Sequence, residues 1–261
     1  MDWLAFIYSF AGSVLFMTIV FFAARSRNRY DVIDIAWGMT FIVIAIISFM
    51  SQPWRISAQL LVVVLVAVWG LRLAAHINGR WSASSSEDKR YVTMREQYTK
   101  KRGGIAINMY VRVFIVQAVL AATVAMPVIV LNASHFVQLS WISFTGLLIW
   151  LVGFIFESVG DLQLKNHLKN SKNKGKLMTW GLWKYTRHPN YFGEITQWWG
   201  IFIIALAAPL WQLSIIGPIV ITILLVFISG VPMTEKHFTG RPGWDEYKRR
   251  TSKLFPLLPR S

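Results

Sequence analysis

Cysteine is absent from the 261-residue chain, so disulfides, iron–sulfur clusters and thiol catalysis are excluded. Charged residues are also scarce, at 15% of the chain against 55% apolar residues. Negative charge is the scarcer sign, with 12 acidic and 27 basic side chains. A soluble domain of this size needs more polar surface than this composition supplies. The composition therefore indicates a membrane protein.

Aromatic residues are abundant, with 13 tryptophans and 17 phenylalanines, as suits lipid-facing helices with interfacial anchors. The net charge of +15 is high enough to raise nucleic acid as a partner. The basic residues, however, lie between apolar runs, as they do in proteins whose loops face membrane lipids. We therefore expect membrane lipids as partners and no nucleic acid.

Long runs without a charged residue predict membrane-spanning helices. Trp3–Ala24 is one such run, and it is long enough to cross a hydrocarbon core about 30 Å thick. The charge-free runs 113–156 and 195–234 each have room for two helices, with turns near 132–135 and 209–211. We expect an all-α, polytopic protein whose residues 1–261 form a single membrane domain with seven transmembrane helices. The expected spans are about 3–24, 32–50, 56–77, 108–131, 141–163, 191–208 and 211–230, followed by a basic tail over 231–261.

The placement of lysine and arginine predicts the orientation of these spans. All basic residues except Arg55, Arg72 and Arg112 lie in the four segments 25–29, 80–102, 165–187 and 236–260. Seven spans put these four segments on one side of the membrane. Because basic loops remain in the cytoplasm, we expect the N-terminus outside and the C-terminus in the cytoplasm.

Ionisable residues within or at the edges of the spans are candidates for function, because charge is costly at membrane depth. They are Asp34, Arg72, Arg112, Glu157, Asp161 and Glu194, each near the cytoplasmic end of its expected helix. One interpretation is a site that opens to the cytosol. The alternative is that these side chains reach the interface or pair for folding, with Asp34 paired to Arg72 or Arg112.

Glu157, Asp161 and Lys165 recur at a spacing of four and so share one helix face. On a functional face the carboxylates would accept from ribose hydroxyls or an amide, and Lys165 would meet a phosphate. An Asp161–Lys165 ion pair within the helix is the alternative.

The stretch from Gly181 to Glu194 is the most specific in the chain. Pro189 favours the start of a helix, and the free backbone N–H groups of its first turn follow Arg187 and His188. Such a helix start is suited to an anion, and a phosphorylated cofactor would fit it. The alternative is a basic turn at the membrane surface, anchored by aromatic side chains.

The block Arg187-His188-Pro189-Asn190-Tyr191-x-Gly193-Glu194 resembles the C-terminal domain of the steroid 5α-reductase and sterol C14-reductase families. It resembles the isoprenylcysteine carboxyl methyltransferases less closely. Residues 244–256 resemble the tail that follows in all of these. Over about residues 30–258 the chain resembles a bacterial 5α-reductase-like group. The resemblance implies the inner (plasma) membrane of a bacterium, with an active site open to the cytoplasm.

The resemblance implies a membrane reductase that uses NADPH to saturate a carbon–carbon double bond conjugated to a carbonyl in an apolar, steroid- or lipid-like substrate. It implies no metal. Glu157 departs from the steroid enzymes, which have asparagine there, and Arg187 and His188 match the sterol reductases better. The implied cofactor-binding residues are Arg72, Glu157, Asp161, Lys165, Tyr185, Arg187, His188, Asn190, Glu194, His237, Tyr247 and Arg250.

Reduction of an enone moves hydride to the β-carbon, so the carbonyl oxygen needs a hydrogen-bond donor and the α-carbon a proton. The family supplies the donor from a glutamate on the second span and a tyrosine on the third. Asp34 and Trp69 are the nearest matches here. The indole N–H of Trp69 donates a hydrogen bond but is no acid, and Asp34 acts only if burial keeps it protonated. The substrate end thus departs from the steroid pattern.

Two other classes of function stay open. A methyltransferase that uses S-adenosylmethionine on a lipid-like substrate shares the Arg-His-Pro block and needs no proton donor at Asp34. A transporter or scaffold ranks last, because the sequence has no evident inverted repeat or broken mid-membrane helix.

Overall fold

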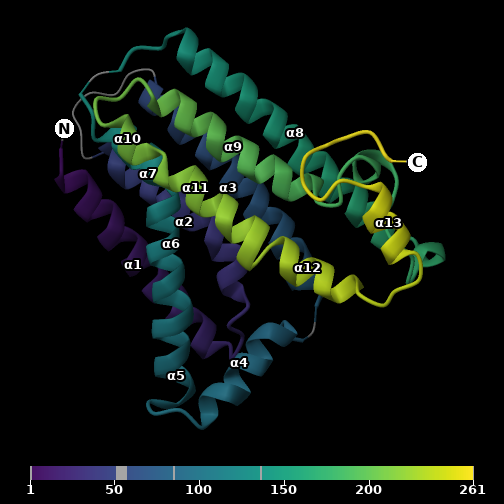
Figure 1. Ribbon diagram of the computed structural model, residues 1–261. Coiled ribbons are helices and arrows are strands. Elements are labelled where there is room, and N and C mark those ends of the chain that lie inside the picture. The colour runs from purple at the N-terminus through teal and green to yellow at the C-terminus, as the bar shows by residue number, and fades with distance from the viewer. Residues whose placement is uncertain (1, 51–57, 85, 136, 261) are drawn as a thin grey trace. The chain divides into compact units, whose positions relative to one another are not determined.

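The computed structural model describes residues 2–50, 58–84, 86–135 and 137–260 of the chain. Helices predominate among these residues, and an isolated parallel bridge pairs Thr186 with Ser252. This agrees with the all-α fold expected from the sequence (Figure 1).

Helices occupy all seven segments expected from the apolar runs, although residues 56 and 57 of the third lie outside the described residues. The segment 104–132 is interrupted by a π-helical stretch and by a break at Ala125, before Pro127. The first residues of the expected basic tail, 231–238, are helical and form α12, which follows the last apolar segment. The helices are α1 (Leu4–Ser26), α2 (Val32–Met50), α3 (Ala58–Ala83), α4 (Lys89–Thr99), α5 (Gly104–Met109), α6 (Val116–Val124), α7 (Met126–Asn132), α8 (Trp141–Lys169), α9 (Pro189–Ala205), α10 (Trp211–Ser214), α11 (Ile216–Ile223), α12 (Val231–Phe238) and α13 (Trp244–Arg250).

Among the described residues, six helical segments are long and apolar enough to cross a membrane. They are α1, α2, α3, Gly104–Val124, α8 and Trp211–Phe238. At 17 residues, α9 is shorter than any of them. The chain is therefore a polytopic membrane protein by the length and composition of its helices.

Contacts divide the chain into two compact units, which we describe separately. Unit 1 contains residues 1–140 and 205–216, and unit 2 contains residues 141–204 and 217–261. In unit 1, α2 and α3 touch at Gly38 and Gly70, where a Cβ on either residue would lie within 2.7 Å of the other's carbonyl oxygen. An apolar core that includes Phe21, Tyr30 and Phe114 packs the ends of α1 and α2 on the segment 104–118.

In unit 2, α8 and α9 lie side by side and touch through glycines that recur every seven residues (Figure 1). A Cβ on Gly153 would lie 2.5 Å from the carbonyl oxygen of Gly193, which is closer than real Cβ contacts come. The two backbones therefore meet without intervening side chains, as in other close-packed membrane helices. The contact glycines are Gly146, Gly153 and Gly160 on α8 and Gly193 and Gly200 on α9.

Candidate functional site

A buried polar cluster lies where α8 meets α9 in unit 2. The amide of Asn190 on α9 donates to Asp161 Oδ1 on α8 at 3.3 Å. One turn along α8, Glu157 is 2% exposed, and its Oε2 accepts from Gln197 Nε2 at 2.5 Å. Glu194 follows Asn190 by one turn and is also buried. The structure thus brings Asp161 together with Asn190 and gives Glu157 a partner on the facing helix.

The glycine contacts explain why these side chains meet. The amide nitrogen of Glu157 lies 2.5 Å from the position that a Cβ on Gly193 would occupy. Gly193 precedes Gln197 by one helical turn, so Glu157 and Gln197 flank the point of closest approach. The backbones are therefore close enough for the side chain of Gln197 to donate a hydrogen bond to the carboxylate of Glu157. The sequence block is therefore both a packing motif and a source of polar groups.

Gln197 is a site residue that the sequence analysis missed. It is fully buried, and its Oε1 has no hydrogen-bond partner among the described residues. An unpaired buried acceptor costs about 1–3 kcal/mol, so this oxygen favours a ligand that donates to it. The sequence signal that could have identified it is its side-chain amide, which lies one turn after Gly193 within the charge-free run that starts at Ile195.

Arg187 lies outside this cluster and connects the turn before α9 with α12 and with the end of α13. Its side chain is 7% exposed, and its Nε donates to Glu235 Oε1 on α12 at 2.9 Å. Its Nη1 donates to the carbonyls of Lys248 at 3.0 Å and Thr251 at 2.6 Å. The sequence analysis placed Arg187 beside an anion site. In the structure these contacts use its guanidinium to hold the C-terminal residues, and its role toward a cofactor stays a prediction.

His188 shares the same carboxylate. It is 2% exposed, its Nε2 lies 3.1 Å from Glu235 Oε1, and its ring stacks on Tyr191 at 5.3 Å. Burial lowers the pKa of His188 below its usual range, although the hydrogen bond with Glu235 acts in the opposite direction. The imidazole is therefore neutral at pH 7. Its Nε2–H donates to Glu235, since a carboxylate can only accept.

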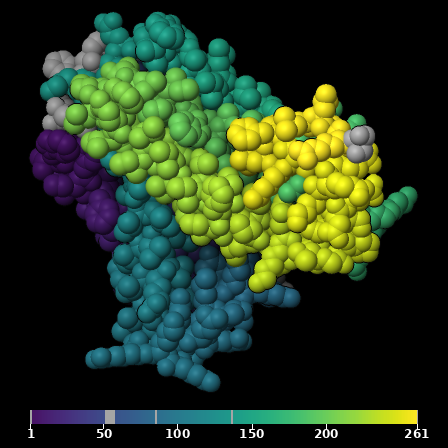
Figure 2. Space-filling model, in the orientation of Figure 1, coloured from purple at the N-terminus to yellow at the C-terminus, as the bar shows by residue number. Residues whose placement is uncertain are grey.

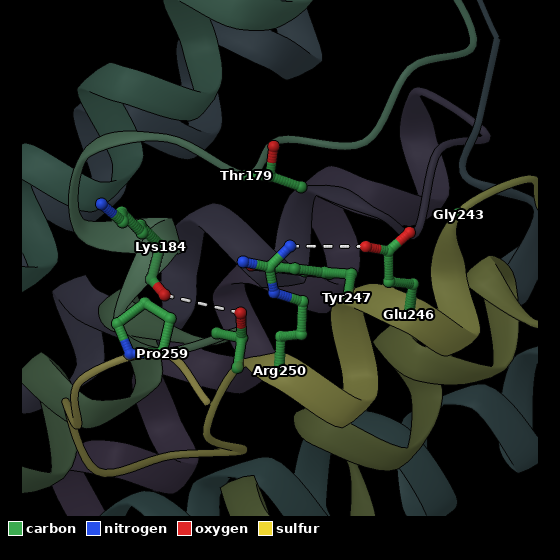
Figure 3. Close-up of a pocket in the computed structure, with 8 residues that line it drawn as sticks. Thr179, Lys184, Gly243, Glu246, Tyr247, Arg250 and Pro259 are labelled. Carbon is green, nitrogen blue, oxygen red and sulfur yellow. Dashed lines mark hydrogen bonds and ion pairs between the residues drawn. The ribbon is translucent and has the colours of Figure 1, made fainter. Parts of the chain in front are cut away.

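Two further predicted residues, Tyr247 and Arg250, line one pocket of about 330 Å³ (Figure 3). Arg250 crosses the pocket, and its Nη1 lies 3.4 Å from Glu246 Oε1. Tyr247 donates its hydroxyl to the carbonyl of Trp183 at 2.6 Å, and burial raises its pKa. The pocket is lined by Thr179, Lys184, Gly243, Glu246, Tyr247, Arg250, Thr251 and Pro259.

The other residues predicted for the cofactor end are more exposed. Lys165 follows Asp161 by one turn of α8 and reaches solvent, as does His237 on α12. Tyr185 is exposed at the end of the turn before Arg187, where its carbonyl accepts from Leu257 N at 3.1 Å.

Asp34 belongs to unit 1, where it is paired. Its Oδ1 accepts from the hydroxyl of Tyr91 at 2.6 Å, and its Oδ2 accepts from Arg90 Nη2 at 2.7 Å. Both partners come from α4. The sequence analysis offered Arg72 or Arg112 as an arginine partner of Asp34, and the structure shows an arginine of α4, Arg90, on this carboxylate. Tyr91 was missed, since nothing in the local pattern marks it.

A second carboxylate, Asp31, holds α4 in position. It accepts from Arg29 at 2.9 Å, from Trp81 Nε1 at 2.7 Å and from the amide of Asp88, which caps α4, at 3.1 Å. Burial raises the pKa of Asp31, but these hydrogen bonds outweigh it and hold the pKa below its usual range. Asp31 thus ties the start of α2 to α3 and α4.

Trp69 and Arg72 also belong to unit 1, on α3. Trp69 is buried and packs edge-on against Phe41 with ring centroids 5.3 Å apart. Arg72 follows it by three residues and is partly buried. The ring contact of Trp69 fits a packing role. The functional roles of Trp69 and Arg72 stay predictions.

Together, these features define a polytopic, all-helical membrane protein in which two glycine-packed helices enclose a cluster of acids and amides. The family described as Protein of unknown function (DUF1295) matches residues 20–251, and the chain belongs to this family.

Named relatives match shorter stretches. The chain is 29% identical over 114 residues to 3-oxo-5-alpha-steroid 4-dehydrogenase 1 of Mus musculus, which covers 44% of this chain and 42% of the relative. The same protein of Bos taurus matches at 29% over 114 residues, or 44% of this chain and 41% of the relative. The chain is also 47% identical over 47 residues to Probable O-methyltransferase ustE of Ustilaginoidea virens, covering 18% and 16%. No solved structure matches the chain. These matches confirm the resemblance that the sequence blocks indicated.

Proposed function

We propose that this protein is a membrane-bound reductase that uses NADPH to saturate a carbon–carbon double bond conjugated to a carbonyl in an apolar, steroid- or lipid-like substrate. The observation that carries the proposal is the contact between Asp161 and Asn190 beside the buried Glu157–Gln197 pair. Similarity to 3-oxo-5-alpha-steroid 4-dehydrogenase 1 of Mus musculus supports the class of reaction.

The chemistry of this cluster fits a dinucleotide. Ribose hydroxyls and a nicotinamide carboxamide are donors, and the cluster is rich in acceptor oxygens from Glu157, Asp161, Asn190 and Glu194. The buried Oε1 of Gln197, which has no partner in the described chain, accepts from such a donor. Phosphates need cations, and Arg250 and Lys165 of the same unit are exposed for this purpose.

When bound, NADPH supplies the hydride. The protein has to supply a hydrogen bond to the carbonyl oxygen, a proton for the α-carbon and a site that excludes water. We assign the proton to Tyr91, whose O–H donates to the carboxylate of Asp34 and is oriented by it, with Trp69 N–H as a second donor. Unlike the tryptophan, a phenol both donates and transfers a proton.

We further propose that residues 1–261 form one membrane domain with α9 as the sixth of seven spans. The basic segments support a C-terminal tail in the cytoplasm, and the family resemblance supports the inner membrane of a bacterium as the location. Cysteine labelling of single-cysteine variants in intact cells tests this orientation, because the natural chain has no cysteine. Labelling at residue 174 from outside the cell would contradict it.

The test of function is ligand binding to the purified protein in detergent. NADPH is expected to raise the melting temperature, and Asp161→Ala should lose at least tenfold in NADPH affinity while it remains folded and membrane-inserted. Asp245→Ala is the matched control, since Asp245 is an exposed acid of the same unit. Unchanged affinity in Asp161→Ala would remove this residue from the site.

A second candidate is a methyltransferase that uses S-adenosylmethionine on a lipid-like substrate. The similarity to Probable O-methyltransferase ustE favours it. The same melting experiment decides between the two cofactors: stabilisation by S-adenosylmethionine and none by NADPH would reverse the order of the two proposals.

A further inference from the structure

The C-terminal segment 252–260 is held in a fixed path on unit 2. The carbonyl of Leu254 accepts from Thr186 Oγ1 at 2.8 Å, and the amide of Leu257 donates to the carbonyl of Tyr185 at 3.1 Å. Because the backbone is tied at these points, the directions of the side chains between and beside them are fixed as well.

Three large apolar side chains of this segment point away from the protein. Phe255, Leu257 and Leu258 are 66%, 55% and 83% exposed, and we call these three residues the apolar patch. The segment lies at the surface, in the yellow part of Figure 2. Apolar side chains that are gathered and exposed on a fixed backbone mark an interaction surface.

The apolar patch continues the apolar surface of the membrane helices. The ring of Phe255 lies 6.0 Å from that of Phe192 on the first turn of α9, and Phe192 lies 5.0 Å from Phe156 on α8. Phe156 lies on α8, which is long and apolar enough to cross a membrane. The apolar patch therefore lies at the level where α9 begins.

Basic side chains flank the apolar patch in sequence. Lys253 precedes it and Arg260 follows it, and both are exposed. A bilayer surface with anionic headgroups is complementary to this combination, because apolar groups enter the acyl boundary while long cationic side chains reach phosphates.

We propose that residues 252–260 are an interfacial anchor. The apolar patch inserts into the lipid bilayer beside the start of α9, and Lys253 and Arg260 bind the phosphates of anionic lipids. The anchor fastens the tail that Arg187 and Tyr247 join to the rest of unit 2. This inference does not rest on the proposed reductase function.

The absence of cysteine makes a direct test simple. Leu258→Cys and Phe255→Cys are each labelled with an environment-sensitive fluorophore in the full-length protein, reconstituted into vesicles of phosphatidylcholine and phosphatidylglycerol. Ser171→Cys is the matched control, since it is exposed among Lys169, Lys172 and Lys174 and lies outside the apolar patch.

We expect blue-shifted emission at 255 and 258 and at least twofold stronger quenching by a lipid with a shallow nitroxide than at 171. Aqueous iodide should quench the control label more than the other two. Quenching by iodide equal to that of the control would overturn the proposal. Protection from both quenchers would also overturn it, because that result indicates cover by a protein.

Discussion

Arg187 and Glu235 are 48 residues apart in the sequence and form an ion pair of 2.9 Å in which the guanidinium is almost fully buried. Glu235 lies on α12, and the same guanidinium also holds carbonyls at the end of α13 and beyond it. The pair therefore joins the start of α9 to the last two helices of the chain.

Glu235→Gln is expected to loosen the C-terminal residues, because it leaves the buried cation of Arg187 without its counter-charge. Breaking a buried pair on one side costs about 3–5 kcal/mol. The melting temperature should fall, and trypsin should cleave at Arg241 and Lys248 sooner. Glu246→Gln removes an exposed pair with Arg250 and should leave both measurements unchanged. Equal trypsin resistance in the two variants would contradict the role of Glu235.

The neutral, buried His188 predicts a pH dependence of stability. Its pKa in the folded protein is lowered, so between that value and about 6.5 the unfolded chain binds more protons than the folded one. Stability should therefore fall as the pH drops from 7 to 5, by at most about 1.4 kcal/mol per pH unit. In thermal unfolding experiments, the stability of His188→Gln should fall less steeply between pH 7 and pH 5. If the variant shows the same pH dependence as the natural protein, His188 is not its source.

Gly153→Ala should separate α8 from α9. The new Cβ would lie 2.5 Å from the carbonyl oxygen of Gly193, and a backbone atom cannot move aside as a side chain can. Overpacking of this kind costs about 1–3 kcal/mol, and it should also weaken NADPH binding through the Glu157–Gln197 contact. Gly79→Ala is the control, because a Cβ on this α3 residue has nothing within 4 Å. A fall in melting temperature common to both variants would refute the packing argument.

The Asp34–Tyr91 pair predicts a separation of catalysis from binding under the proposed function. Tyr91→Phe and Asp34→Asn should each lower turnover at least tenfold and change NADPH affinity less than twofold, because neither residue belongs to the acceptor cluster of unit 2. Tyr98→Phe, another buried tyrosine of α4, serves as the control. Full turnover in Tyr91→Phe would discard its role as a donor.

The sequence predicted the all-helical fold, because long apolar runs without a charge favour helices. The expected span 32–50 has the same first and last residues as α2, and in the sequence Asp31 precedes this apolar run and Ser51 and Gln52 follow it. The helix α4 was not predicted, because its pattern is that of a basic loop. It is held by Asp31 and Asp34, which lie more than fifty residues earlier.

The candidate site was predicted in part. Asp161, Asn190 and Glu194 were found because they stand in a recognisable block or at helical spacing. Gln197 and Tyr91 were not found as site residues, because each is defined by a partner distant in sequence. Arg187 illustrates the same limit: its local setting indicates an anion site, and only the fold supplies Glu235 as the anion.

The touching backbones of α8 and α9 have a consequence for ligand affinity. Two helices in contact at five glycines cannot rotate or shift in register without a collision, so the acids and amides between them keep one arrangement whether or not a ligand is present. A molecule that binds there does not have to freeze mobile side chains first, and little of its interaction energy is lost to ordering the protein.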